Sequence, residues 1–336
     1  MDQPLLEIRD LRVYYRSVRG EYRVVDGVSL SVYRNEIFGL AGESGCGKST
    51  LVEGILRLVR PPGYIKTGEA LFHLDDWGAG DRVDLLKLSS EELREIRWKH
   101  LSYIPQGSMN SLNPVMRIED QIIDAITFHS DLSREAARAR AMEVLRMVGL
   151  SERVARSYPH ELSGGMKQRA IIAMAITLQP QLIVADEPTT ALDVNVQRAI
   201  LETIANIKAE TGATVLFVSH DMGVHAELVD RLAIMYAGKV MEVAHVNEAF
   251  DRPLHPYSQR LIASIPTLGG ARVRLEGIPG LAPSPLAWPT GCRFHPRCPH
   301  AMEVCKQVEP PLIEVSPGHQ VACHLYGNGE VWVEKG

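Results

Sequence analysis

A glycine-rich segment that ends in a lysine offers the clearest chemistry in this sequence. Residues 42–50, Gly-Glu-Ser-Gly-Cys-Gly-Lys-Ser-Thr, fit the pattern G-x-x-x-x-G-K-S/T, which wraps the phosphates of a nucleotide. The apolar run 37–41 before it predicts a buried strand, and 51–56 after it predicts the start of a helix. Lys48 is expected to reach the β- and γ-phosphates, and the Ser49 hydroxyl to ligate Mg²⁺. The segment predicts binding of ATP or GTP, with further loop contacts from Gly42, Ser44, Gly45, Cys46, Gly47 and Thr50.

A second candidate group is a pair of carboxylates that follows an apolar run. Residues 182–185, Leu-Ile-Val-Ala, predict a short buried strand that ends at Asp186 and Glu187. Open α/β sheets bind their ligands at the carboxyl ends of the strands. We therefore expect Asp186 to hold Mg²⁺ and Glu187 to polarise the attacking water. The alternative is that the two carboxylates only cap the next helix.

A third candidate is a small-residue turn, Ser163-Gly164-Gly165, at the start of a predicted helix. Helix N-termini bind anions, so this turn predicts a second phosphate-binding element, distinct from the first.

The elements that must position these groups indicate an α/β fold. Apolar runs at 182–185 and 214–219 predict buried strands, with helical patterns between them, as in a parallel sheet covered on both faces. Residues 101–105 predict a further strand, which ends at Gln106. Alternation at 6–9 and 24–32 predicts antiparallel strands, separated by a polar stretch rich in tyrosine. Residues 89–97 predict an acidic helix, and 134–148 predict a helix within a mainly helical subdomain.

Composition restricts the class of protein. The 336 residues carry a formal net charge of −5, which argues against a dedicated nucleic-acid binder. The first residues do not resemble a signal peptide, and no run approaches 18 consecutive apolar residues, so any membrane role is expected to come through partners.

In this order the motifs resemble those of the ATP-binding subunits of ABC transporters. The sequence has the phosphate loop, Gln106, Leu162-Ser163-Gly164-Gly165-Met166, Asp186-Glu187, Asp193 and His220 in register over roughly residues 5–245. The family signature is LSGGQ, and Met166 stands here in place of its usual Gln. The resemblance implies a P-loop NTPase core with a mixed sheet, an antiparallel β subdomain and an α-helical subdomain at about 107–165.

The resemblance also implies a role for single residues. Gln106 would coordinate Mg²⁺ and couple the site to a transmembrane partner, and His220 would contact the γ-phosphate. Ser163, Gly164, Gly165 and Met166 would complete the ATP site of a second ATPase subunit, and Asp193 would lie at that interface. Tyr15 would stack on the adenine, with Tyr14 and Tyr22 as alternatives. Lys48, Glu187 and His220 would be the catalytic residues.

Three further segments resemble the ATPases of dipeptide/oligopeptide importers: 109–114, 254–266 and 291–299. The resemblance implies an ATPase domain at 1–250 and a C-terminal extension at 251–336. It also implies two transmembrane permease subunits, a second ATPase (a paralogue or a second copy) and an extracytoplasmic substrate-binding protein. The chain would lie at the cytoplasmic face of the membrane. Nickel or oligosaccharide import is the alternative cargo, and a soluble ABC ATPase with a regulatory or repair role is the alternative of another class.

Four of the five cysteines, Cys292, Cys298, Cys305 and Cys323, lie close together in the sequence. Their spacing, C-x₅-C-x₆-C-x₁₇-C, lacks the C-x₂₋₄-C pairs of common zinc sites and suits a [4Fe-4S] cluster, which similar family members carry. The nearby His295, His300, His319 and His324 keep zinc as the lesser alternative, and reduced structural cysteines are a third.

Overall fold

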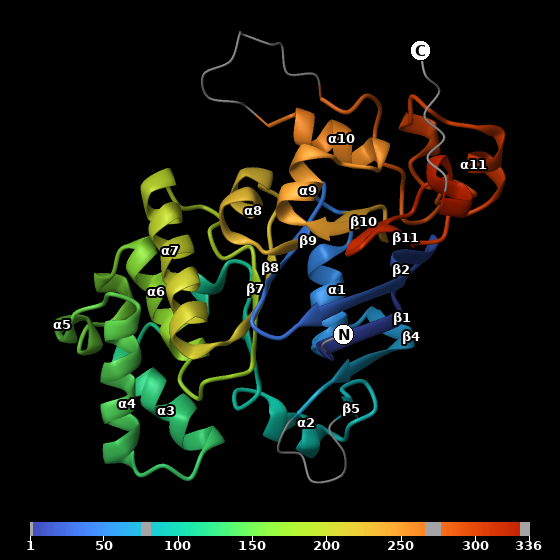
Figure 1. Ribbon diagram of the computed structural model, residues 1–336. Helices are drawn as coiled ribbons and strands as arrows, with labels where there is room; N and C mark the ends of the chain where they lie inside the picture. The colour runs from blue at the N-terminus through green and yellow to red at the C-terminus, as the bar shows by residue number, and fades with distance from the viewer. Residues whose placement is uncertain (1–2, 75–81, 266–276, 330–336) are drawn as a thin grey trace. The chain divides into compact units, whose positions relative to one another are not determined.

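The computed structural model describes residues 3–74, 82–265 and 277–329 (Figure 1). The chain forms two compact units. The first unit holds Val32–Ile37 and Phe72–Val218 with the N-terminal residues to Leu5. The second unit holds Leu6–Ser31, Phe38–Leu71 and the chain from Ser219 onward. The candidate groups of the sequence are thus distributed over both units.

Three parallel strands form the sheet of the first unit. They lie in the order β8 (Thr214–Val218), β7 (Leu182–Asp186), β6 (Leu101–Ile104). Every residue of β7 and β8 is buried, as expected of parallel strands that are covered on both faces. In-register pairs such as Ile104↔Ala185 and Asp186↔Val218 bring the carboxyl ends of neighbouring strands to one edge. These strands confirm the expected parallel α/β sheet.

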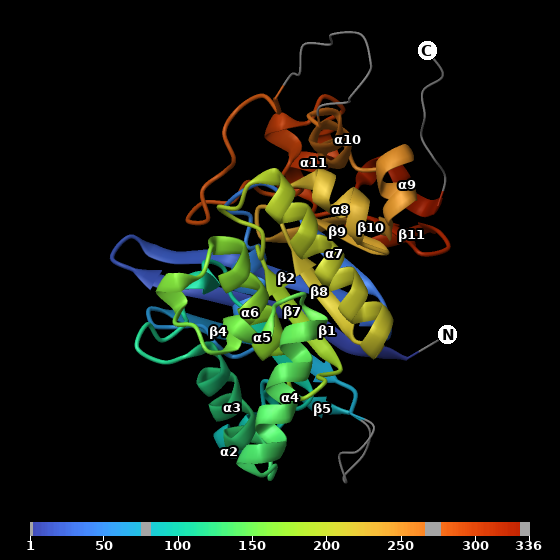
Figure 2. The ribbon, with the colours of Figure 1, turned by 90° about the vertical axis from the view of Figure 1, so that its left-hand side faces the viewer.

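The helices of the first unit are α2 (Ser90–Ile96), α3 (Ile118–His129), α4 (Arg134–Met147), α5 (Glu152–Ala155), α6 (Gly164–Ala175) and α7 (Val194–Thr211), with a two-residue strand β5 (Val83–Asp84) before α2. Of these, α2 and α4 lie close to the helices predicted at 89–97 and 134–148, and α6 begins at the predicted Ser163 turn. A capping box fixes the start of α2, because Ser89 and Glu92 bond each other's backbone N–H groups. Helices α3 and α4 lie side by side in both views (Figures 1 and 2), with Ile122 and Ile126 of α3 and Leu145 of α4 buried.

The C-terminal extension contributes strands to the sheet of the second unit. That sheet has the order β11 (Ile313–Ser316), β12 (His319–Val321), β10 (Lys239–His245), β9 (Arg231–Tyr236), β3 (Ile37–Ala41). Strand β3 is parallel to β9, and the other neighbours are antiparallel. The pair Glu242↔Val321 joins the extension directly to β10. The extension therefore packs as a continuation of this unit, and the boundary near residue 250 stays a prediction.

The N-terminal strands are longer than the sequence indicated. β1 (Pro4–Ser17) and β2 (Gly20–Tyr33) have 14 residues each and lie in the order β2-β1-β4 with β4 (Gly63–Phe72). Tyr14, Tyr15 and Tyr22 lie within these strands, so the expectation of a polar stretch between shorter strands was wrong. The reason is that β1 continues to bury side chains up to Tyr14, whose hydroxyl donates to Asp26 of β2.

The remaining helices of the second unit are short. They are α1 (Lys48–Ile55), α8 (Met222–Leu228), α9 (Val246–Asp251), α10 (Pro256–Ala263) and α11 (Glu303–Gln307). In the parts of the chain that the structure describes, no helix is both long and apolar enough to cross a membrane.

Two buried histidines of the second unit make its stability depend on pH. Burial lowers the pKa of His225 and of His255 to about 4, although the Ser219 carbonyl and Glu242 respectively oppose the shift. Both rings are neutral in the fold at pH values where the unfolded chain, with a histidine pKa of about 6.5, already binds protons. Stability should therefore be full above about pH 6.5 and fall as the pH drops toward 4, by up to about 3 kcal/mol per histidine.

Urea unfolding between pH 4 and pH 7 measures this dependence. His255→Asn keeps a side-chain acceptor for the Tyr257 N–H at the start of α10 but removes the titrating ring, so it should flatten about half of the slope. The exposed His160 provides the matched control, His160→Asn, which should keep the wild-type slope. A His255→Asn profile as steep as the wild type would contradict the assignment.

Candidate functional site

The phosphate loop joins β3 to α1, as the motif requires. Gly42 and Gly47 adopt φ angles of 145° and 109°, which L side chains rarely adopt. A Cβ on Gly42 would lie 2.2 Å from the Met235 carbonyl oxygen, and one on Gly47 would lie 2.6 Å from the Val24 carbonyl oxygen. Both positions therefore need glycine for conformation and for space. Ser44 and Gly45 form the exposed tip of the loop.

Lys48 folds back over this loop from the first turn of α1. Its Nζ donates to the carbonyl oxygens of Gly42 at 2.8 Å and Glu43 at 3.2 Å, and the residue is 5% exposed. Ser49 and Thr50 follow it on the same turn and are half-buried. Cys46 is buried in the loop, and burial raises the pKa of its thiol. The loop thus presents an ammonium group and a helix N-terminus, an arrangement that binds phosphate.

Gln106 and Glu187, two of the predicted residues, meet at the carboxyl end of the sheet in the first unit. Gln106 follows β6, and its Nε2 donates to Glu187 Oε2 over 3.0 Å. Thr190 Oγ1 donates to the same oxygen over 2.8 Å. Glu187 has a φ of 47°, and its N–H bonds the Val218 carbonyl, so its backbone is fixed in an unusual conformation. Asp186, the last residue of β7, is 1% exposed. The next helix, α7, is capped by Asp193.

The Ser163 turn begins α6 as predicted. The Ser163 hydroxyl caps the helix by accepting from the Met166 N–H at 3.3 Å. Ser163 and Gly164 are exposed, whereas Gly165 is buried against α7. A Cβ on Gly165 would lie 2.5 Å from Val196 Cγ1, while one on Gly164 would find no atom closer than 3.5 Å. Gly165 is therefore needed for close packing against α7, whereas position 164 has room for a side chain.

Gly165→Ala should destabilise the chain by about 1–3 kcal/mol, because the stiff side chain of Val196 cannot move aside. Denaturant unfolding measures the loss. Adding Val196→Ala should recover most of it, and Gly164→Ala is the matched control, with a stability close to wild type. Equal losses at both glycines would contradict the packing argument.

The other predicted residues lie at element ends or within β1. Asp193 caps α7 by accepting from the N–H groups of Asn195 and Val196 at 3.1 and 3.0 Å. His220 is exposed just after β8. Tyr15 is half-buried, whereas Tyr14 is buried and its hydroxyl donates to Asp26. Of these two rings, the Tyr15 ring is therefore the more exposed.

The four C-terminal cysteines lie near one another in the second unit. Burial raises the pKa of Cys323 to about 12, and the thiols of Cys292, Cys298 and Cys305 add to that rise. The Cys292 N–H also bonds the Cys305 carbonyl at 2.8 Å. Within the described ranges, no group of three or more His, Cys, Asp or Glu is placed to hold a single metal ion.

Three of the four histidines of the zinc alternative have other partners. His295 Nδ1 lies 2.9 Å from the Cys292 carbonyl oxygen, and His324 Nε2 lies 2.8 Å from that of Val308. His319 Nε2 lies 2.7 Å from Glu242 Oε1.

Sequence reasoning missed three residues beside the phosphate loop. Glu43, inside the loop, contacts both Tyr257 and Arg297. The only local signals were the His-Pro-Tyr residues 255–257, within the segment 254–266, and the arginines between the cysteines. The helix α10 begins at Pro256, but nothing in the local pattern indicated contact with the loop.

Comparisons with known proteins identify the family to which the chain belongs. A family model described as "ABC transporter" matches residues 25–190. The chain is 41% identical to the dipeptide transport ATP-binding protein DppD of Caldanaerobacter subterraneus, over 97% of this chain and 98% of that protein. It is also 41% identical to the oligopeptide transport ATP-binding protein OppD of Bacillus subtilis, over 96% of this chain and 88% of that protein.

A solved structure shows the same fold. The ATP-binding cassette MJ0796, in a dimeric post-hydrolysis state bound to ADP and Pi, superposes with a TM-score of 0.62 at 28% identity, over 72% of this chain and 98% of that one. The chain therefore belongs to the ABC transporter family, as an ABC-type ATPase that binds ATP and Mg²⁺. Its residues 241–305 match a second family model, "Oligopeptide/dipeptide transporter, C-terminal region".

Proposed function

We propose that this chain is the ATP-hydrolysing subunit of an importer for dipeptides or oligopeptides. The observation that carries the cargo is the match of residues 241–305 to the C-terminal region of oligopeptide/dipeptide transporters. The relatives named for dipeptide and oligopeptide transport, which align over nearly the whole chain, support it. Among the described residues, no contact favours nickel or oligosaccharide as the cargo.

We assign ATP binding to the phosphate loop and to residues at the carboxyl ends of β6 and β7. The phosphate loop would hold the β- and γ-phosphates through its N–H groups and Lys48, and Tyr15 would stack on the adenine. Mg²⁺, held by Ser49, Gln106 and Asp186, would neutralise charge on the phosphates. Glu187 would orient and polarise the water, and His220 would contact the γ-phosphate. The bonds from Gln106 and Thr190 to Glu187 support this role, because they fix the carboxylate that must hold the water.

The proposed partners follow from the resemblance to ABC transporters, and the exposed Ser163 and Gly164 support contact with a second ATPase subunit. Ser163, Gly164, Gly165 and Met166 would contact ATP bound to a second ATPase subunit, with Asp193 at the same interface. That subunit would be a paralogue or a second copy of this chain. Two permease subunits would hold the pair at the cytoplasmic face of the membrane, and an extracytoplasmic binding protein would deliver the peptide. Closing and opening of the ATPase pair would then drive alternating access.

The test is purification of the chain with its genomic neighbours, followed by ATPase assays with and without a peptide-loaded binding protein. Stimulation by the loaded binding protein is the expected result. Association with a permease but indifference to every peptide would overturn the peptide cargo in favour of nickel or sugars. Failure to associate with any permease would overturn the importer in favour of a soluble ATPase.

We also infer that Cys292, Cys298, Cys305 and Cys323 hold a [4Fe-4S] cluster as a structural staple. The proximity of the four thiols supports the inference, and a cluster with positively charged iron would favour the thiolates of Cys292, Cys298 and Cys323, whose pKa values burial raises. Anaerobic purification with iron, sulfide and zinc analysis tests the inference. Cys305→Ser should lose iron and visible absorption, whereas Cys46→Ser should keep both. Zinc without iron, or no metal at all, would overturn the cluster.

A further inference from the structure

The phosphate loop contains an acidic residue, Glu43, whose negative charge is unfavourable for binding the phosphates of ATP. A carboxylate beside bound ATP repels the triphosphate, and the repulsion is strong where water is partly excluded. The Glu43 side chain is 25% exposed. The loop can therefore bind ATP well only if the charge on this carboxylate is offset.

Arg297 of the C-terminal extension supplies that offset. Its Nη1 donates to Glu43 Oε2 over 3.0 Å, and its Nη2 to Glu43 Oε1 over 3.2 Å, in the two-pronged geometry of a strong ion pair. The Arg297 side chain is 7% exposed, so solvent screens this pair only weakly. Glu43 and Arg297 lie 254 positions apart in the sequence.

The remaining donors of Arg297 fix it in place. Nη1 also donates to the Tyr236 hydroxyl at 3.2 Å, Nη2 to the Ile278 carbonyl at 3.1 Å and Nε to the Pro279 carbonyl at 2.9 Å. All five N–H groups of the guanidinium thus have acceptors, so the cation is oriented before any nucleotide binds.

A second contact holds the backbone of the loop at the same residue. The Glu43 N–H donates to the Tyr257 hydroxyl over 2.9 Å, and Tyr257 is fully buried. Tyr257 belongs to the His-Pro-Tyr segment, where the ring of His255 caps α10 by accepting from the Tyr257 N–H at 3.0 Å. The extension thus contacts both the side chain and the main chain of Glu43.

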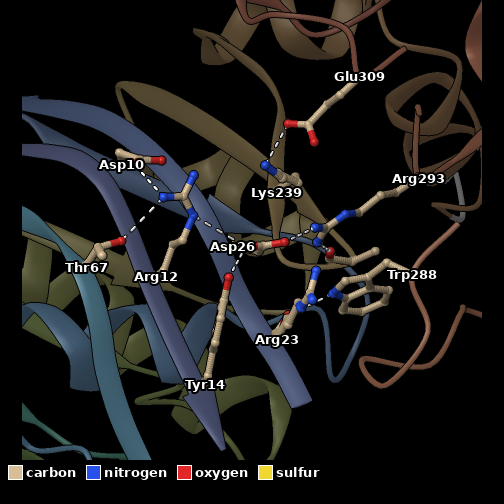
Figure 3. A network of polar contacts seen from close by, with 11 residues as sticks. Asp10, Arg12, Tyr14, Arg23, Asp26, Thr67, Lys239, Trp288, Arg293 and Glu309 are labelled. Carbon is tan, nitrogen blue, oxygen red and sulfur yellow. Dashed lines mark hydrogen bonds and ion pairs between the residues drawn. The ribbon is translucent and has the colours of Figure 1, made fainter. Parts of the chain in front are cut away.

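A polar network supports the far side of the loop. Arg293 donates to Asp26 and to the Ala237 carbonyl, and it lies over the Trp288 ring, whose Nε1 donates to the Arg23 carbonyl (Figure 3). The Asp26 N–H bonds the Gly238 carbonyl at 3.1 Å, and the Gly238 N–H bonds the Cys46 carbonyl at 2.9 Å. Arg293 therefore fixes the turn that holds the other half of the phosphate loop.

We propose that Arg297 is a positioning residue of the ATPase, through which the C-terminal extension neutralises Glu43 and keeps the phosphate loop ready for ATP. Tyr257 positions the same residue through its backbone. Loss of the Arg297 charge leaves an unpaired carboxylate beside the phosphates, and the more highly charged ATP suffers more than ADP.

Calorimetric titration of the full-length chain with ATP and with ADP tests the proposal. Arg297→Gln should raise the Kd for ATP about tenfold and that for ADP only about threefold, with a smaller difference at high salt. The double variant Glu43→Gln/Arg297→Gln should return both values to near wild type. Arg297→Lys keeps the charge and should keep the ATP-to-ADP ratio. A merely structural role would change the unfolding temperature without changing that ratio.

The matched control is Lys306→Gln, which breaks the exposed pair of Lys306 with Glu303 on α11 of the same extension and should leave both Kd values unchanged. Equal weakening of ATP and ADP by Arg297→Gln, or a double variant as weak as Arg297→Gln, would overturn the proposal. If the Arg297 variants do not fold, Glu43→Gln alone decides. It should bind ATP as tightly as the wild type or more tightly, and a tenfold loss would overturn the proposal.

Discussion

Glu187→Gln should abolish ATP turnover and leave ATP binding intact. The amide cannot take up a proton from the attacking water, so kcat should fall by at least about 10²–10⁴-fold, the usual contribution of a positioned general base. The backbone of residue 187 is held by Val218, and the amide oxygen can still accept from Gln106 and Thr190. The loss should therefore appear in chemistry and not in the Kd for ATP.

Single-turnover phosphate release and ATP titration separate these two quantities. Without hydrolysis, ATP should also hold the ATPase pair closed, so a longer-lived ATP-dependent dimer is expected in light scattering. Glu202→Gln is the matched control, since Glu202 is an exposed residue that pairs with Arg198 along α7. It should hydrolyse ATP at the wild-type rate. The same rate in Glu187→Gln would show that Glu187 is not the residue that activates the water.

Local signals in the sequence were sufficient for the elements that carry the site. Apolar runs at 182–185 and 214–219 predicted short strands buried on both faces, and the structure has β7 and β8 there. The helix at 89–97 was predictable because its capping box lies within four residues of sequence. The phosphate loop follows the same rule, since its glycines, its lysine and its flanking strand and helix are contiguous.

Contacts between distant segments could not be predicted in the same way. Tyr257 and Arg297 reach Glu43 across 214 and 254 positions, and no periodicity or spacing relates residues so far apart. The lengths of strands β1 and β2 were underestimated for a related reason. Their outer halves look polar in isolation, yet Tyr14 is buried there because its hydroxyl finds Asp26 on the other strand. A polar residue is buried where a partner satisfies it, and the partner is set by the tertiary fold.

A fully buried carboxylate in β10 explains how the extension is joined to this unit. Glu242 Oε1 accepts from the Leu254 N–H at 2.8 Å and lies 2.7 Å from His319 Nε2, while Oε2 accepts from the His255 N–H at 2.8 Å. These groups come from the strand β12 of the extension and from the turn before α10. One side chain thus ties together three segments that are not contiguous in the sequence.

Glu242→Ala should cost about 3–5 kcal/mol of the free energy of unfolding, because it leaves three donors, two of them buried, without an acceptor. Denaturant unfolding monitored by circular dichroism measures the loss. Glu309→Ala makes the same substitution at an exposed carboxylate that pairs with Lys239, and it should cost less than about 1 kcal/mol. Glu242→Gln should give an intermediate loss, since the amide oxygen replaces one acceptor while the amide N–H₂ faces another donor.

The same substitution should also weaken nucleotide binding. Glu242 holds the turn that carries Tyr257, and Tyr257 holds the Glu43 N–H, so Glu242→Ala should weaken ATP and ADP binding by similar factors. Arg297→Gln is expected to weaken ATP binding more than ADP binding. That variant leaves the Glu43 carboxylate unpaired but does not displace the Glu43 backbone. Titration of both variants with both nucleotides distinguishes the two effects. A Glu242→Ala protein with wild-type stability would show that β12 and the turn before α10 are held by their apolar packing, with the buried carboxylate contributing no net free energy.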